Sequence, residues 1–171
     1  YLGPIDRTEA SAAEAEAALT LSKDQIQYAQ FWFVKVTPLD DVAFNNLISG
    51  EISKAEEIWQ KKESASSLQN RIVSALIRED YDCAITCAET LYANSQYISE
   101  LISAVVGTGS NLNASTLALS FLDALCEEIG VNKLLPFITI DTWKSHIVVK
   151  ATKPLIDSIE YAIETAQKTK N

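Results

Sequence analysis

Cysteine and histidine are the residues of this sequence that most readily carry out chemistry. Cys83 and Cys87 lie four positions apart, a spacing that puts both thiols on one face of a helix. Zinc sites usually have four ligands and often a closer Cys-x-x-Cys pair. The other candidate ligands, Cys126 and the single histidine His146, are distant in the sequence. We therefore interpret the thiols as reduced core residues and predict no metal site.

Catalytic groups are scarce. His146 lies near Asp141, but no serine or cysteine nucleophile motif accompanies the pair. Adjacent acidic residues such as Glu56 and Glu57 point in different directions on a helix, which favours a solvated surface. The loop "GTGSNLN" (107–113) has two glycines but neither the lysine nor the spacing of a phosphate-binding loop. We therefore predict that the chain is not an enzyme and binds no cofactor.

Length and charge limit the classes of protein that remain. A chain of 171 residues can bury a sizeable core, and we expect one helical domain over residues 1–171. The net charge of −9 disfavours nucleic acid and anionic membranes as partners. An odd number of scattered cysteines is typical of a reduced, cytoplasmic protein. The chain starts at Tyr1 without a signal-peptide pattern, and we expect it to be a piece of a longer protein.

Helix signals dominate the pattern of apolar residues, so the sequence predicts an all-α fold of about eight to ten short helices. N-terminal helices are expected within 8–36, helical pairs within 38–107 and C-terminal helices within 114–168. The segment 134–150 is ambiguous: its β-branched residues allow a short hairpin, and Asp141 as a cap allows a helix, which we favour. An amphipathic helix is expected at 153–167.

The stretch "YAQFWFVKV" (28–36) gathers four aromatic residues. "SKDQ" (22–25) is a capping-box pattern that would start a helix carrying this stretch. Such a helix is apolar almost all round, which predicts burial between neighbours. Trp32→Ala would then cost about 3–5 kcal/mol. The alternative is a partly exposed anchor, because aromatic residues often dominate binding surfaces.

Two segments repeat the same pattern. "ISGEISKAEEIW" and "IREDYDCAITCA" begin 29 residues apart, at Ile48 and Ile77. The alignment pairs Gly50 with Glu79, Ile52 with Tyr81, and Ala55 with Ala84. Each segment follows one amphipathic helix and begins another, so it predicts a repeated helix–turn–helix unit.

At these residues the chain resembles the tetratricopeptide repeat, a family in which a Gly-x-Tyr-x-x-Ala turn joins two helices. The matching residues are Ala43, Leu47, Gly50 and Ala55 in one copy, and Leu76, Tyr81, Ala84 and Ile85 in the other. The chain departs from the family in its offset of 29 residues instead of about 34, in Glu79 at the turn glycine, and in the missing closing proline. Over 38–93 the resemblance implies stacked antiparallel helical hairpins, as a right-handed solenoid or a compact helical array.

The order of segments is also similar to a group of poorly characterised bacterial proteins in which a J-domain-like region precedes a helical repeat region. The shared run is "YAQFWF…PLDDVAFNNLISGEISKAEEIWQKKES", within 28–64. The resemblance implies that this chain is the C-terminal helical part. The His-Pro-Asp signature of the J-domain is absent, so no co-chaperone activity is assigned to the chain itself.

The tetratricopeptide resemblance also implies a binding site. Members of that family often hold a partner's C-terminal carboxylate with Lys, Asn and Arg residues, and Asn70 falls at such an Asn, next to Arg71. The matching positions of the first copy hold Asp40 and Phe44, so the set is incomplete. The alternative is that Asn70 is a structural or solvated polar residue.

We predict a protein–protein interaction module that binds a peptide or partner protein, with basic partners favoured by the acidic surface. It would be the partner-binding part of a J-domain-like co-chaperone if that resemblance holds. The alternative is a structural dimerisation or scaffold domain that self-associates through a patch around Phe31 and Trp32. An enzyme with an unfamiliar site is the third hypothesis.

Overall fold

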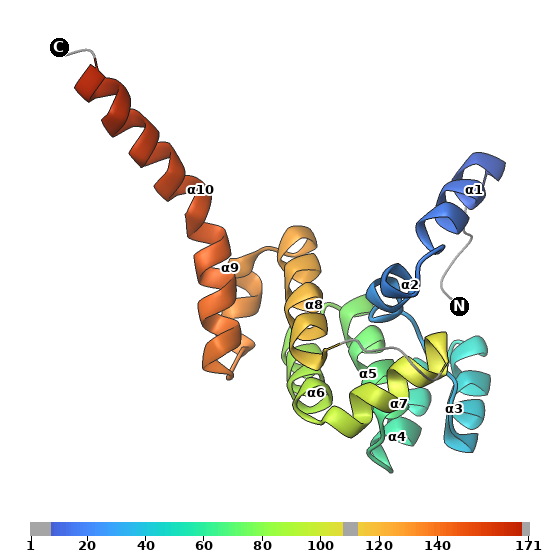
Figure 1. The fold of residues 1–171 in the computed structure, drawn as a ribbon. Helices are drawn as coiled ribbons and strands as arrows, with labels where there is room; N and C mark the ends of the chain where they lie inside the picture. Colours follow the sequence, from blue (N-terminus) through green and yellow to red (C-terminus); the bar gives the residue numbers. More distant parts are fainter. Residues whose placement is uncertain (1–7, 108–112, 169–171) are drawn as a thin grey trace. The chain divides into compact units, whose positions relative to one another are not determined.

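The computed structural model describes residues 8–107 and 113–168. Within these residues the protein is all-α and contains no strand (Figure 1), which confirms the predicted fold class. The helices are Glu9–Ala18 (α1), Ser22–Ala29 (α2), Pro38–Ile48 (α3), Ile52–Gln60 (α4), Ala65–Ile77 (α5), Tyr81–Ala93 (α6), Ser95–Val106 (α7), Ala114–Glu128 (α8), Val131–Leu134 (α9) and Asp141–Lys168 (α10), with a 3-10 turn, η1, at Leu135–Phe137.

The chain divides into two compact units, and the division falls within α8. The first unit ends at Phe121 and contains α1 to α7 with the beginning of α8. The second unit starts at Leu122 and contains the rest of α8, then α9, η1 and α10. Each unit is described by itself below.

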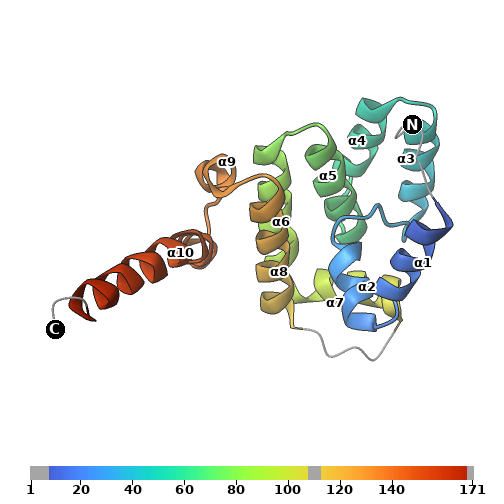
Figure 2. The same ribbon diagram turned by 90° about the horizontal axis from the view of Figure 1, so that it is seen from above.

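Helical hairpins form the centre of the first unit. Helix α3 packs against α4, and α5 packs against α6, while α4 and α5 join the two pairs (Figure 2). Small residues allow the close approach within the pairs, because Ala43, Ala55 and Ala84 are fully buried. Trp59, which is 1% exposed, fills the space between α3, α4 and the segment before them, in ring contact with Phe33 and Phe44. The paired helices therefore form a compact array.

The two hairpins turn in the same way. Gly50 follows α3 with φ of 80°, and Glu79 follows α5 with φ of 58°. In each turn the next residue donates its N–H to the carbonyl five residues before it, at 2.9 Å in both cases, which is the bond of a Schellman-type helix end. The offset of 29 residues seen in the sequence is thus also an offset between equivalent backbone turns.

The expected helix through the aromatic stretch is wrong in its second half, because α2 ends at Ala29 and residues 30–36 are not helical. Side chains of α5 form hydrogen bonds with this stretch of backbone instead. Gln69 Nε2 donates to the carbonyls of Ala29, Gln30 and Trp32 at 3.2, 2.8 and 3.1 Å. These bonds replace the ones that a continuing helix would have made within itself.

The remaining expectations on local structure fare better. The ambiguous segment 134–150 is helical, as we favoured: η1 and the start of α10 at Asp141 replace the alternative hairpin. The helix expected at 153–167 is continuous with α10, and Pro154 lies inside it. The loop expected at 107–113 begins at Gly107, which ends α7 with φ of 82°, and its residues 108–112 lie outside the described ones.

Candidate binding groove between α1 and α2

An open groove of about 400 Å³ lies between α1 and α2. Its lining residues come from α1, from the corner after it, and from the end of α2 and the turn beyond: Ser11, Glu14, Ala15, Leu19, Tyr28 and Trp32. The two aromatic rings are the largest exposed groups there, with exposed fractions of 51% for Tyr28 and 42% for Trp32.

Packing and hydrogen bonds hold one face of α2 against the first unit. The opposite face of α2 therefore lies at the groove. Ile26 and Ala29 are buried in the first unit. Gln25 Nε2 donates to the carbonyl of Leu19 at 2.8 Å, which closes the corner between α1 and α2. Gln30, at the end of α2, accepts a hydrogen bond from the Tyr92 hydroxyl at 2.5 Å. The turn that follows α2, in which the Trp32 N–H donates to the Ala29 carbonyl at 3.1 Å, brings Trp32 to the same groove as Tyr28.

The groove combines aromatic faces with negative charge. Helix α1 has the sequence EASAAEAEAA, with three glutamates and no basic residue, and Glu14 lines the groove itself. The faces of Trp and Tyr rings attract cations such as guanidinium and ammonium groups, and a nearby carboxylate adds an ion pair. This arrangement is suited to a Lys or Arg side chain flanked by apolar groups.

The structure separates the two aromatic residues that we predicted as a binding patch. Phe31 is half-buried and stacks on Phe121, with ring centroids 5.3 Å apart. Phe33 stacks on Trp59 at 5.9 Å. Trp32, between them in sequence, points to the groove instead. The aromatic stretch is therefore partly core and partly surface, and the expectation that Trp32 is buried is wrong.

Asn70 is fully buried and its amide is used inside the protein. Its Oδ1 accepts from the Val34 N–H at 2.7 Å, and its Nδ2 donates to the Val34 carbonyl at 2.8 Å and to Asp40 at 3.2 Å. Asp40 also accepts from Trp59 Nε1 at 3.1 Å. The structure thus places Asn70 in the structural role that was the alternative to carboxylate binding.

Arg71 is half-buried, and its Nε is buried without a hydrogen-bond partner in the described part of the chain. Burial raises the pKa of the nearby Cys87 thiol to about 12, and the charge of Arg71 opposes part of this rise. Burial and Asp123 likewise raise the pKa of Cys126. Both thiols are therefore protonated near neutral pH, whereas a nucleophile or metal ligand must be a thiolate.

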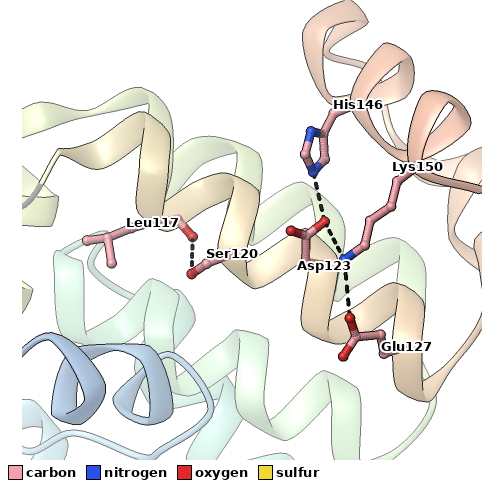
Figure 3. Close-up of polar contacts among 6 residues, drawn as sticks. All are labelled: Leu117, Ser120, Asp123, Glu127, His146 and Lys150. Carbon is pink, nitrogen blue, oxygen red and sulfur yellow. Dashed lines mark hydrogen bonds and ion pairs between the residues drawn. The ribbon is translucent and has the colours of Figure 1, made fainter. Parts of the chain in front are cut away.

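A second polar cluster lies in the second unit, where α10 meets the end of α8 (Figure 3). Asp123 Oδ1 lies 2.8 Å from His146 Nε2 and 3.0 Å from Lys150 Nζ. Lys150 also reaches Glu127 at 3.2 Å. Burial alone would raise the pKa of Asp123, but the hydrogen bonds from His146 and Lys150 lower it overall.

This cluster joins two helices by ion pairs on a partly exposed surface. His146 pairs with Asp123, whereas the sequence had suggested its neighbour Asp141. Among the described residues, His146 forms no hydrogen bond with a serine or a cysteine, so a nucleophile–base pair is not assembled there. In the same part of the chain, no group of three or more His, Cys, Asp or Glu residues is arranged to hold a metal ion.

Comparisons with protein-family models, with curated proteins and with solved structures give no match to this chain. No helix in 8–107 or 113–168 combines the length and apolar character needed to cross a membrane.

The groove residues Tyr28, Glu14 and Leu19 were not predicted as site residues. A helical wheel places Tyr28 and Trp32 together beside the buried face, but α2 ends before Trp32, so this pattern does not explain how the two rings meet.

Proposed function

We propose that this chain is a protein-interaction module that binds a basic, partly apolar peptide segment in the groove between α1 and α2. The observation that carries the proposal is the pair of exposed rings, Tyr28 and Trp32, beside the Glu14 carboxylate. Large aromatic residues grouped on a surface are typical of binding hot spots, because their burial by a partner releases much free energy for little side-chain entropy.

The rigidity of the support favours this function. Gln69 holds the backbone beneath the rings with three hydrogen bonds from its buried side chain, and the side chain of Gln30 accepts a hydrogen bond from the Tyr92 hydroxyl. A site that is already in its binding geometry loses less conformational entropy when a partner binds. The paired helices α3 to α6 then serve as the scaffold, in the way that stacked helical hairpins support extended binding surfaces.

Charge sets the expected chemistry of the partner. The net charge is −9, and α1 carries glutamates without any basic residue. A segment with Lys or Arg beside apolar residues would gain both ring contact and electrostatic attraction. If the chain is the C-terminal part of a J-domain-like protein, this groove would be its partner-binding end, although the proposal does not depend on that resemblance.

A random peptide display library tests the proposal directly. The wild-type chain should enrich peptides that contain Lys or Arg next to apolar residues. Isothermal titration calorimetry of one enriched peptide should then show a loss of at least about tenfold in affinity for Trp32→Ala, equivalent to about 1.4 kcal/mol. Glu14→Gln should weaken binding less, and should weaken it most for the most basic peptides.

Tyr161→Ala is the matched control, because Tyr161 is 73% exposed on α10 and is not among the residues that line the groove. This variant should bind the peptide as the wild type does. Enrichment of acidic peptides, equal binding by Trp32→Ala, or a library without enriched peptides would each contradict the proposal.

A further inference from the structure

The groove between α1 and α2 has two unlike walls. Both of its aromatic rings come from one side, since Tyr28 lies on α2 and Trp32 lies in the turn beyond it. The side formed by α1 and its C-terminal corner supplies no ring, and its lining residues are Ser11, Glu14, Ala15 and Leu19. A ligand in this groove therefore meets aromatic rings on one side and a carboxylate on the other.

Glu14 is the lining residue that is available for an ion pair. The hydroxyl of Ser11 is already used within α1, where it donates to the Thr8 carbonyl at 2.9 Å and accepts from the Thr8 N–H at 3.0 Å. In the described part of the chain, no basic side chain pairs with Glu14. No lysine or arginine is among the described lining residues. The lining thus offers negative charge and hydrogen-bond acceptors, which suits a cation that carries N–H donors.

The two walls favour a guanidinium group over an ammonium group. A guanidinium ion is flat and weakly hydrated, so its face can stack on an aromatic ring while its edge donates two N–H bonds to a carboxylate. The ammonium group of lysine is compact and strongly hydrated, so it gains less from a ring in an open groove. Trimethyllysine is bound by cages of several rings, and it has no N–H group left to donate to Glu14.

We propose that the groove selects arginine as the anchoring residue of its partner, in preference to lysine and to methylated lysine. The guanidinium group lies against the rings of Tyr28 and Trp32 and pairs with Glu14. Apolar neighbours of that arginine then cover Ala15 and Leu19. This inference rests on the proposed peptide-binding function, and it names the side chain that the site recognises.

A series of defined peptides tests the selection. The peptide acetyl-Leu-Xaa-Leu-amide carries arginine, lysine, trimethyllysine or citrulline at its central position, and citrulline keeps the flat shape of arginine without its charge. Binding is followed by NMR through the indole N–H signal of Trp32. The arginine peptide should bind at least about fivefold more tightly than the lysine and trimethyllysine peptides, and at least about tenfold more tightly than the citrulline peptide. Arginine should also exceed lysine among peptides enriched from the display library, and the same substitutions are made in one of them.

Glu14→Gln separates the ion pair from the net charge of the chain. In this variant the arginine peptide should lose about threefold to fivefold in affinity, while the citrulline peptide should change by less than about twofold. Glu16→Gln is the matched control, because it removes the same charge from an exposed position of α1 that does not line the groove. This control should leave every affinity within about twofold of the wild-type value, since solvent screens a carboxylate outside the groove.

The outcomes distinguish the selection of arginine from the function itself. Equal binding of the arginine and lysine peptides, with library peptides that still depend on Trp32, would overturn the selection and leave the peptide-binding function in place. Tighter binding of the trimethyllysine peptide would overturn it as well and would identify a methyl-ammonium site. An equal loss in Glu14→Gln and Glu16→Gln would show that net charge attracts the ligand, against the proposed pair. If no peptide binds and the library enriches none, the function and the selection fail together.

Discussion

At the scale of single residues, the side chain of Asn70 supplies hydrogen bonds that backbone groups would otherwise form with one another. Its amide satisfies both the N–H and the carbonyl of Val34, in a segment that belongs to no helix. Asn70→Ala would leave two buried backbone groups without partners, and each such group costs about 1–3 kcal/mol. We expect the free energy of unfolding to fall by about 2–4 kcal/mol, measured by urea denaturation.

The control for this change is Asn45→Ala, because Asn45 is exposed on α3. That variant should lie within about 0.5 kcal/mol of the wild type. An equally small effect of Asn70→Ala would show that Val34 finds other partners, and that residues 30–36 do not depend on this amide.

Two tryptophans of the first unit should differ in their effect on stability. Trp59 is 1% exposed, stacks with Phe33 and donates its N–H to Asp40, so Trp59→Ala should cost about 3–5 kcal/mol. Trp32 is 42% exposed, so Trp32→Ala should cost no more than about 1 kcal/mol of stability while it weakens peptide binding at least about tenfold. Thermal unfolding of both variants gives the comparison, and a large loss in Trp32→Ala would mean that its ring belongs to the core.

At the scale of helices and turns, Glu79 occupies a position that suits glycine. Its φ of 58° lies in the left-handed region, where a side chain costs about 1–2 kcal/mol, while the equivalent turn has Gly50 at φ of 80°. Glu79→Gly removes the strain but gives the unfolded chain more freedom, so we expect a net gain of about 0.5–1 kcal/mol in chemical denaturation. Gly50→Ala should lose a similar amount, and destabilisation by Glu79→Gly would contradict the assignment of the turn.

The helices that could be predicted from the sequence are those whose ends are determined locally. Thr37, Pro38 and Asp40 form the start of α3 within four residues, and the structure shows this capping box. The "SKDQ" pattern was less reliable: α2 begins at Ser22 without a side-chain cap, and Gln25 bonds to Leu19 instead. The end of α2 is set by α5, roughly 40 residues further along the chain. Periodicity within one segment contains no information about such distant partners.

The candidate groove was only partly predictable for the same reason. The sequence offered Trp32 as a partly exposed anchor only as the alternative to burial, and it offered Asn70 either as a carboxylate-binding residue or as a structural one. The Asn70 amide instead forms hydrogen bonds with the backbone of Val34, and the two residues belong to segments that are far apart in the chain. Glu14 was not predicted as a site residue, since nothing in the local sequence shows that α1 lies beside the aromatic rings. The packing of whole helices decides which polar residues line the groove and which form hydrogen bonds inside the protein.

The link between α8 and α10 should respond to acid. The pKa of Asp123 is lowered in the folded protein, so the unfolded state binds the proton more readily. Its contribution to stability is therefore complete above its unfolded pKa of about 3.9 and is lost as the pH falls through the lower folded value. Because the group is partly exposed, we expect a contribution of at most about 1 kcal/mol.

The variant Asp123→Asn measures this contribution. Its unfolding temperature should lie below that of the wild type at neutral pH, and the difference should shrink as the pH falls to about 3. Asp157→Asn, on the exposed part of α10, is the control and should show no such convergence. A difference between Asp123→Asn and the wild type that stays constant with pH would mean that the carboxylate charge does not stabilise the fold.

At the scale of the whole molecule, exposed apolar residues gather in two places, at the groove in the first unit and along the second half of α10 in the second unit. Neither surface is needed for the core: buried apolar residues are concentrated in α3 to α8 and at the start of α10. Folding and binding should therefore be separable by mutation.

Deletion of residues 151–171 tests that separation. The described side chains of this segment are exposed up to Gln167, so the truncated chain should unfold at the same temperature as the full chain at low concentration. Lys150 and its ion pairs with Asp123 and Glu127 remain. A lower unfolding temperature of the truncated chain at every concentration would show that the second half of α10 packs against its own chain.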